Sequence, residues 1–363
     1  MKQMSALIVL AVLITAGPCA GLHAQTVGHV IYLSGDPIAV RAARRFWPAI
    51  GPGTALQPFD FLETTADELL EIETDDAIGV RAMVRMQPHS ALYLELLADV
   101  PDGQRHAVRL LSGAVSVRMR DPDPRARLEV VTAATRVTGA GAEYDVTIAA
   151  DGAVLVTVAR GTARVSDPRG RSLFADVERA VEHRPDGTFR SVPLTVGRSD
   201  RFRSVWRDQI EANLRFDAAA AYRLYAGLYL EQLPHFQDTY LSLMGMRHVL
   251  DRWMEADRQG RDPQRVTEAA AAELDELASY VEAVRDSLRR IETSWYQLQQ
   301  LSRFAAAGAG PLDTAVAERL TVSEFFERLA DDARIVEDQM HTARYVIGLH
   351  ARRAAARHVQ QPG

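Results

Sequence analysis

The sequence of 363 residues is poor in the residue types on which several common functions depend. It has one cysteine, Cys19, and one lysine, Lys2. A single cysteine provides neither a disulfide framework nor the paired cysteines of the usual zinc sites. The other basic residues are arginines, intermixed with Asp and Glu in a chain of net charge −6. Nucleic-acid binders carry a concentrated basic face, so we predict no nucleic-acid partner.

Motifs of catalysis are also missing from the sequence. There is no His-Glu-x-x-His run and no Gly-x-Ser-x-Gly elbow. Gly139-Ala140-Gly141 resembles part of a dinucleotide loop, but it precedes a predicted strand instead of a helix, which favours a tight β turn. We therefore predict no catalytic, cofactor-binding or metal-binding residues, and no enzymatic activity.

A few polar residues could still bind a cation or transfer a proton, but each has a simpler interpretation. They are Asp60, Asp121-Pro122-Asp123, Asp145, Asp331-Asp332, His341, His350 and His358. Asp60 and Asp145 are expected to cap turns. The other residues are expected to be solvated, because carboxylate pairs on surfaces are usually solvated and scattered helix histidines seldom form sites.

Long hydrophobic runs are missing except at the N-terminus. Lys2 precedes an apolar stretch, Ala6–Gly17, which is too short to span a membrane. Pro18 follows this stretch, and Ala24 offers a small residue at a cleavage position before Gln25. This pattern predicts a cleavable signal peptide over residues 1–24 and a soluble, periplasmic mature protein with no membrane span. Lipidation of Cys19 is the less favoured alternative, because Pro18 stands where a lipid-attachment site has Gly or Ala.

Residues 26–192 show the alternation of apolar and polar residues that is typical of β-strands. Leu70-Glu71-Ile72-Glu73-Thr74 and Ala114–Met119 both alternate in this way. Ala150-Asp151-Gly152 predicts a hairpin turn between two such runs. Many short strands at intervals of about ten residues predict an all-β sandwich or roll.

Several segments of this half resemble the FecR-type periplasmic domain. They are Gly28–Gly35, Gly53 with Asp60–Thr64, Gln87–Leu92, Leu111–Val115, Gly141–Val146 and Val156–Val165. The resemblance lies in spacing more than in identity, and Ala140 and Ala142 replace an arginine and a threonine that are common in the family. Known FecR regulators pass a signal to a sigma factor and have a membrane span before the β domain. This chain has a predicted cleavable signal there, so the resemblance implies a binding or scaffolding module.

Residues 193–198 read as a linker, and residues 199–358 have helical periodicity, which predicts an antiparallel four-helix bundle. Ser199 is expected to cap a first helix running to about Glu231, and Pro234 to begin a second that ends near Gly260. Asp262-Pro263 predicts the start of a third helix, and Gly308–Pro311 a loop. Thr321-Val322-Ser323-Glu324 predicts a capping box for the fourth helix.

The last two predicted helices each carry an apolar seam with spacings of three and four. The first seam is Leu274, Leu277, Val281, Val284, Leu288, Ile291, Trp295 and Leu298. The second is Val322, Phe326, Leu329, Ala333, Val336, Met340, Ala343 and Ile347. We expect the two helices to pack antiparallel within one chain; an intermolecular coiled coil, and hence a homo-oligomer, is the alternative.

An aromatic cluster precedes these seams. Its members are Tyr222, Tyr225, Tyr229, His235, Phe236 and Tyr240. Core packing between helices is favoured over a ligand groove. The sequence as a whole predicts a multi-domain β plus α protein that binds a partner in the cell envelope. That partner is a protein or, alternatively, peptidoglycan; a component of envelope signal transduction is the alternative function.

Overall fold

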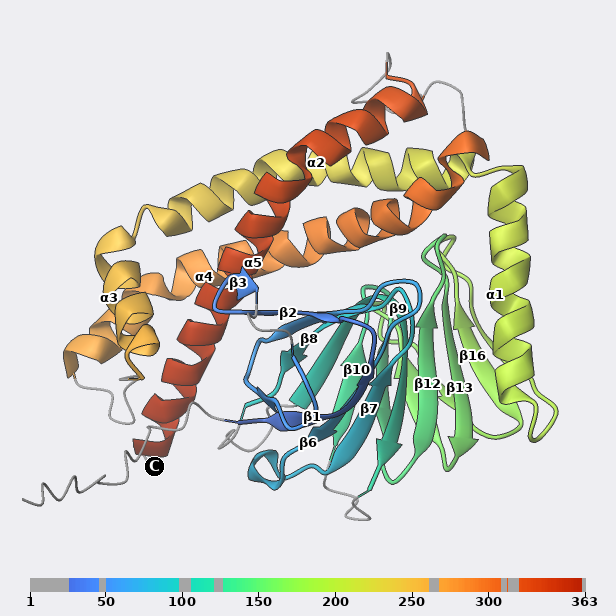
Figure 1. The fold of residues 1–363 in the computed structure, drawn as a ribbon, viewed down its shortest axis with the longest axis horizontal. Coiled ribbons are helices and arrows are strands. Elements are labelled where there is room, and N and C mark those ends of the chain that lie inside the picture. Colours follow the sequence, from blue (N-terminus) through green and yellow to red (C-terminus); the bar gives the residue numbers. More distant parts are fainter. Residues whose placement is uncertain are drawn as a thin grey trace, which may run out of the picture.

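The computed structural model describes residues 26–45, 50–97, 106–120, 127–260, 268–307, 312 and 320–360. The predicted signal peptide, Asp121–Asp123, Asp262-Pro263 and Gly308–Pro311 lie outside these residues. Within them, strands occupy the chain as far as Pro193 and helices follow from Ser199 (Figure 1). The predicted fold class, a β region followed by packed helices, is confirmed.

Two sheets form the β region, and they share one long strand, β9 (His106–Met119). The first sheet is β4 (Ala55–Leu56), β1 (Gly28–Ser34), β6 (Leu69–Thr74), β7 (Ala82–Met86), β9, β12 (Glu143–Ile148), β13 (Val154–Arg160), β16 (Arg179–His183) and β17 (Phe189–Pro193). The second sheet is β3 (Arg44–Arg45), β2 (Ile38–Arg41), β5 (Phe61–Glu63), β8 (Ala91–Glu95), β9, β10 (Leu128–Val131), β11 (Arg136–Gly139), β14 (Ala163–Ser166) and β15 (Ser172–Ala175). Neighbours are antiparallel except β9 and β10, which are parallel.

Strand β9 changes sheet at Gly113. Residues up to Ser112 pair with β8, and residues from Gly113 on pair with β12. Gly113 has φ +77°, and a Cβ atom there would lie 2.4 Å from the carbonyl oxygen of His89. Only glycine combines this backbone conformation with so close an approach, so Gly113 is the corner that joins the two sheets.

The second sheet is buried on both faces around β8. Leu92 and Leu94 point into the sandwich core, whereas Ala91 and Tyr93 belong to a second core shared with the helices. Side chains alternate between the two faces of a strand, and the apolar run in β8 therefore serves two cores. The β region and the helices are joined by a continuous hydrophobic core.

The described residues contain five α-helices and two short 3₁₀ helices. They are α1 (Ser199–Phe216), α2 (Ala219–Met244), α3 (Arg247–Arg258), α4 (Glu268–Leu301) and α5 (Val322–Gln360), with η1 (Asp76–Ile78) in the β region and η2 (Ser302–Ala307) after α4. Helices α2 and α4 pack along each other across one end of the sandwich, α5 crosses them, and α1 runs beside β13 and β16 (Figure 1).

The predicted helix boundaries are wrong in the first half of this region. The chain breaks at Asp217, which is extended, instead of near Pro234. Helix α2 continues through Pro234, which lies on its exposed side. Ser199 makes no side-chain cap; Arg198 holds the cap position without such a bond. An exposed proline costs a helix one hydrogen bond, and the packing of α2 against α4 compensates for that loss.

The two apolar seams are confirmed as buried faces. In α4 all eight seam residues are buried, and in α5 Phe326 and Ala333 pack against the same core. Both seams are buried against elements of the same chain. The predicted capping box is also present, because the amide of Thr321 donates to Glu324 Oε2 (2.8 Å) and that of Glu324 to Thr321 Oγ1 (3.2 Å).

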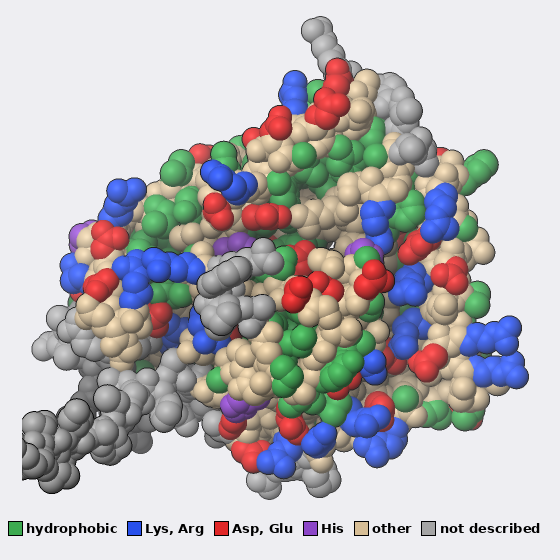
Figure 2. All heavy atoms as spheres, in the orientation of Figure 1, with side chains coloured by type: hydrophobic (Ala, Val, Ile, Leu, Met, Phe, Trp, Pro, Cys, Tyr) green, Lys and Arg blue, Asp and Glu red, His purple; other side chains and the backbone are tan. Residues whose placement is uncertain are grey.

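Helix α1 docks on the outer face of the first sheet through polar contacts. Trp206 Nε1 donates to Glu182 Oε1 in β16 at 2.9 Å, and Arg203 forms an ion pair with Asp145 in β12. Basic and acidic side chains intermix over the face shown in Figure 2, with arginines frequent along the edge formed by α1. Among the described residues, none of the helices combines the length and apolar composition that crossing a membrane requires.

Candidate binding site between the sandwich and the helices

A buried ion pair lies where α4 and α5 meet the second sheet. Arg344 Nε of α5 donates to Glu292 Oε1 of α4 at 2.7 Å, and both side chains are almost fully buried (2% and 1% exposed). Arg344 Nη2 also donates to the hydroxyl of Tyr296 at 3.1 Å. Buried charges are costly unless they are paired and hydrogen-bonded, and this arginine uses most of its donors within the junction.

Three aromatic rings surround the guanidinium group of Arg344. Its carbon lies 4.8 Å from the ring centre of Phe61, 5.6 Å from that of Tyr93 and 5.9 Å from that of Tyr296. Cations are attracted to the faces of aromatic rings, most strongly when water is excluded. Phe61 is in β5, Tyr93 in β8 and Tyr296 in α4, so one side chain of α5 connects the sheet to the helices.

His341 accepts a hydrogen bond from the same arginine. Its Nδ1 lies 2.9 Å from Arg344 Nη1, and its ring stacks edge-on against Phe61 with centres 4.9 Å apart. A guanidinium group only donates, so this contact requires the neutral imidazole. Burial, together with the positive charge of Arg344, lowers the pKa of His341 to about 3. The prediction that His341 is solvated is wrong, because α5 places it half-buried against Phe61 of β5.

We expect acid to destabilise the protein through His341. The pKa of this histidine is lower in the folded chain (about 3) than the ordinary value of 6.5, so the unfolded chain binds the extra proton between these values. The contribution is complete above pH 6.5 and is lost as the pH falls toward 3, by up to about 1.4 kcal/mol per pH unit. Urea unfolding of wild type and His341→Gln at pH 7, 6, 5 and 4 measures it. Wild type should lose stability more steeply than His341→Gln; parallel curves would contradict the assignment.

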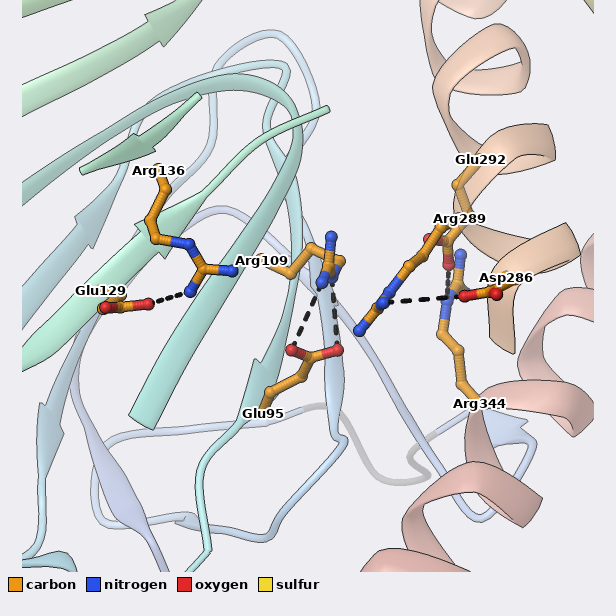
Figure 3. Close-up of polar contacts among 8 residues, drawn as sticks. All are labelled: Glu95, Arg109, Glu129, Arg136, Asp286, Arg289, Glu292 and Arg344. Atoms are coloured by element: carbon orange, nitrogen blue, oxygen red, sulfur yellow. Dashed lines mark hydrogen bonds and ion pairs between the residues drawn. The ribbon is translucent and has the colours of Figure 1, made fainter. Parts of the chain in front are cut away.

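A second set of charges lies on the sandwich side of the junction (Figure 3). Arg109 of β9 donates from Nε and Nη2 to the two carboxylate oxygens of Glu95 at 3.3 and 3.4 Å. Burial opposes ionisation of Glu95, but Arg109 and Arg289 outweigh it and lower its pKa. Arg289 of α4 reaches toward this pair and lies 3.9 Å from Asp286, whereas Glu129 and Arg136 pair farther along the sheet.

A cavity of about 500 Å³ lies under α2 and α4, and Arg109, Arg289 and Glu292 are among the residues that line it. The strand side is formed by β9, the turn after β10 and the β12–β13 hairpin, and the helix side by the facing surfaces of α2 and α4. Two buried side-chain oxygens in its wall, Glu292 Oε2 and Gln297 Oε1, have no hydrogen-bond partner among the described residues. Ligand pockets are of this size and combine apolar walls with a few polar groups.

Comparison with known protein families finds a match within the β region. Residues 60–164, which run from the start of β5 into β14, match the family described as FecR protein. This chain carries a FecR domain. The match is shorter than the 26–192 span predicted from the sequence, and β1 to β4 and β15 to β17 lie outside it.

Solved structures and curated proteins add little to the FecR match. Two crystal structures of a "putative anti-sigma factor" from Parabacteroides distasonis align with TM-scores of 0.32 at 12% and 13% identity. Each alignment covers 39% of this chain and 62% or 63% of the other. This chain therefore spans less than two thirds of those proteins. No curated protein matches.

The junction combines the FecR domain with residues outside it. Phe61, Tyr93 and Arg109 belong to the FecR domain, whereas Glu292 and Arg344 come from the helices. Sequence reasoning missed all five residues as a group. The apolar positions carried a signal, since they alternate in predicted strands. The two helix charges carried none, because charged residues in helices are usually solvated.

Asp60 caps a turn, as predicted, and also forms an ion pair with Arg41. Its Oδ2 accepts from the amide of Gln57 at 2.8 Å, and its Oδ1 accepts from Arg41 Nε at 2.9 Å. Burial raises the pKa of Asp60, against the opposing attraction of Arg41. Asp145 does not cap a turn; it lies within β12 and pairs with Arg203 of α1, so that prediction is wrong.

The remaining candidates that the structure describes form no metal site. Asp331-Asp332 is exposed, as predicted, and Gly139-Ala140-Gly141 connects β11 to β12 as a turn between the two sheets. His350 is half-buried, with Nε2 3.4 Å from the carbonyl of Leu274, so it is not fully solvated. The side chain of His358 lies outside the described residues. In the described part of the chain, no group of three metal-ligating side chains comes together.

The aromatic cluster of α2 is confirmed as core. Tyr222, Tyr225, Tyr229 and Phe236 are buried, and Tyr240 packs against them, whereas His235 is exposed. Tyr225 also donates to the carbonyl of Asp151 in the β12–β13 hairpin at 3.1 Å. This contact ties α2 to the FecR domain at the rim of the cavity.

Proposed function

We propose that this protein is an exported, non-enzymatic binding protein of the cell envelope, in which the FecR domain and the helices act as one unit. The observation that carries this proposal is the cavity at their junction, whose wall is built from both halves. A site assembled from two structural regions is a common location for a ligand.

The shared core supports treating the two halves as one unit. Phe61, Tyr93 and Leu111 of the β region are buried with the seams of α4 and α5. A chain cut after the last strand would expose these side chains to water. The full-length protein is therefore the appropriate material for tests of binding.

Export rests on the N-terminal sequence. We expect a tagged full-length chain to appear in the periplasmic fraction with Gln25 at its N-terminus, as determined by N-terminal sequencing. Cys19→Ser should leave this result unchanged, and Ala24→Asp should block cleavage. A mature chain that begins at Cys19 would instead establish lipidation, and a full-length chain retained in the cytoplasm would contradict export.

Binding at the junction is tested with a photo-crosslinking amino acid in living cells. Position Leu224 lines the cavity and is 42% exposed, whereas position Tyr32 in β1 is 51% exposed and does not line it. We expect one envelope protein, or peptidoglycan, to crosslink at Leu224 and not at Tyr32. A membrane signalling protein captured at Leu224 would favour the alternative role in signal transduction. Equal capture at both positions would contradict a binding site at the junction.

A further inference from the structure

The wall of the cavity at the junction combines an apolar part with a charged part. Most of the lining is apolar and comes from both sides of the junction. These apolar residues are Leu110, Leu111, Ile148, Val154, Leu224 and Leu228. An apolar wall of this kind favours a ligand with an apolar body, because burial of that body removes apolar surface from water.

The helix side of the cavity is rich in positive charge. Arg289 and Arg290 of α4 line it from exposed positions, and Arg109 lines it from β9. Arg285 lies one turn before Arg289, and burial together with the charge of Arg289 lowers the pKa of Arg285. The carboxylates close to these arginines are Glu95, which forms an ion pair with Arg109, Asp286, and the buried Glu292. A wall with this excess of arginine attracts an anionic group.

Two polar atoms in the wall still require a partner. Glu292 Oε2 and Gln297 Oε1 belong to side chains that are 1% and 4% exposed, and neither oxygen has a hydrogen-bond partner among the described residues. An unsatisfied buried acceptor is costly, so a hydroxyl or N–H group placed beside it is stabilising. Both residues are on α4, and both line the cavity.

We propose that the cavity binds a small organic anion with an apolar body and at least one hydroxyl or N–H donor. The anionic group lies at Arg289 and Arg290, the apolar body lies between the hairpin and α2, and the donor reaches the oxygens of Glu292 and Gln297. This inference rests on the proposed binding role of the junction and goes beyond it, because it assigns a small ligand to the cavity in addition to the envelope partner expected at Leu224.

A matched pair of fluorescent probes tests each part of this proposal on the purified full-length protein. 8-Anilinonaphthalene-1-sulfonate and N-phenyl-1-naphthylamine share the same apolar body and N–H group, and only the first carries an anionic sulfonate. We expect the sulfonate probe to bind one site, and more tightly than the neutral probe.

Variants distinguish the contribution of the arginines to probe binding from that of the apolar wall. Arg289→Ala/Arg290→Ala should weaken binding of the sulfonate probe by about tenfold or more, because charge-assisted contacts are lost, and should leave the neutral probe unchanged. Leu228→Trp should weaken both probes by filling the cavity. The control, Arg328→Ala/Arg334→Ala, removes two exposed arginines of α5 outside the cavity and should change neither.

Three results would overturn the proposal. They are no saturable binding of the sulfonate probe, equal weakening by the α5 control pair, and binding that survives both cavity variants. Each variant is compared with wild type by thermal unfolding, and the arginine pair is exposed, so its result does not depend on a disturbed core. Failure here would leave export and the Leu224 crosslinks intact, whereas failure of those experiments would leave probe binding intact.

Discussion

Arg344→Met is expected to lower the free energy of unfolding by about 3–5 kcal/mol, because it leaves Glu292 buried without its cation. The pair is joined at 2.7 Å, and both side chains are almost fully buried. The variant also removes the positive charge from among the rings of Phe61, Tyr93 and Tyr296. Urea unfolding monitored by circular dichroism measures the difference.

The double variant Arg344→Met/Glu292→Leu separates the pair from its surroundings. Replacing both charges with apolar side chains should recover most of the loss, because no uncompensated charge remains. Arg328→Met, on the exposed side of the same helix, should stay within about 0.5 kcal/mol of wild type. If the double variant is as unstable as Arg344→Met alone, the packing of the arginine stem, and not the ion pair, holds the junction.

Gly113→Ala is expected to destabilise the protein by about 3 kcal/mol or more, through backbone strain and a steric clash together. At φ +77° an alanine is strained, and its Cβ would lie 2.6 Å from Ser90 Cα as well as against the carbonyl of His89. Neither contact can relax by rotation of a side chain. Equilibrium urea unfolding gives the magnitude.

Gly141→Ala is the matched control for this prediction. Gly141 also has a positive φ, +61°, but a Cβ atom there would meet nothing within 4 Å. Its substitution should therefore cost only the strain, about 1–2 kcal/mol. Equal losses at the two glycines would show that the corner in β9 relaxes easily and that the close approach to β8 is unimportant.

The strands were predictable because their alternation reflects burial on one face. Leu70–Thr74 alternates and forms β6, and the Asp151-Gly152 turn joins β12 to β13. The division into two sheets was not predictable, since it depends on Gly113, which the sequence presents only as a glycine before a strand. Pairing between strands distant in sequence leaves no local signal, and neither does the parallel contact of β9 with β10.

The helices show the same division between local and long-range information. The seam of α4 and the capping box at Thr321 depend on spacing within one helix, and both were predicted. The continuation of α2 through Pro234 depends on packing against α4, which the sequence does not display. The buried pair of Glu292 and Arg344 was missed for the same reason, because only the contact with β5 and β8 buries it.

The second core has a consequence for the order in which the chain matures. Phe61, Tyr93 and Leu111 belong to strands that are synthesised early, whereas their cover comes from α4 and α5, which lie between residues 268 and 360. Until those residues arrive, the sandwich presents an uncovered apolar face, a state prone to aggregation. Helix α5 is therefore the last described element to cover this face. A product that ends before α4 would be expected to aggregate and to be removed by proteolysis, even though β1 to β17 are present.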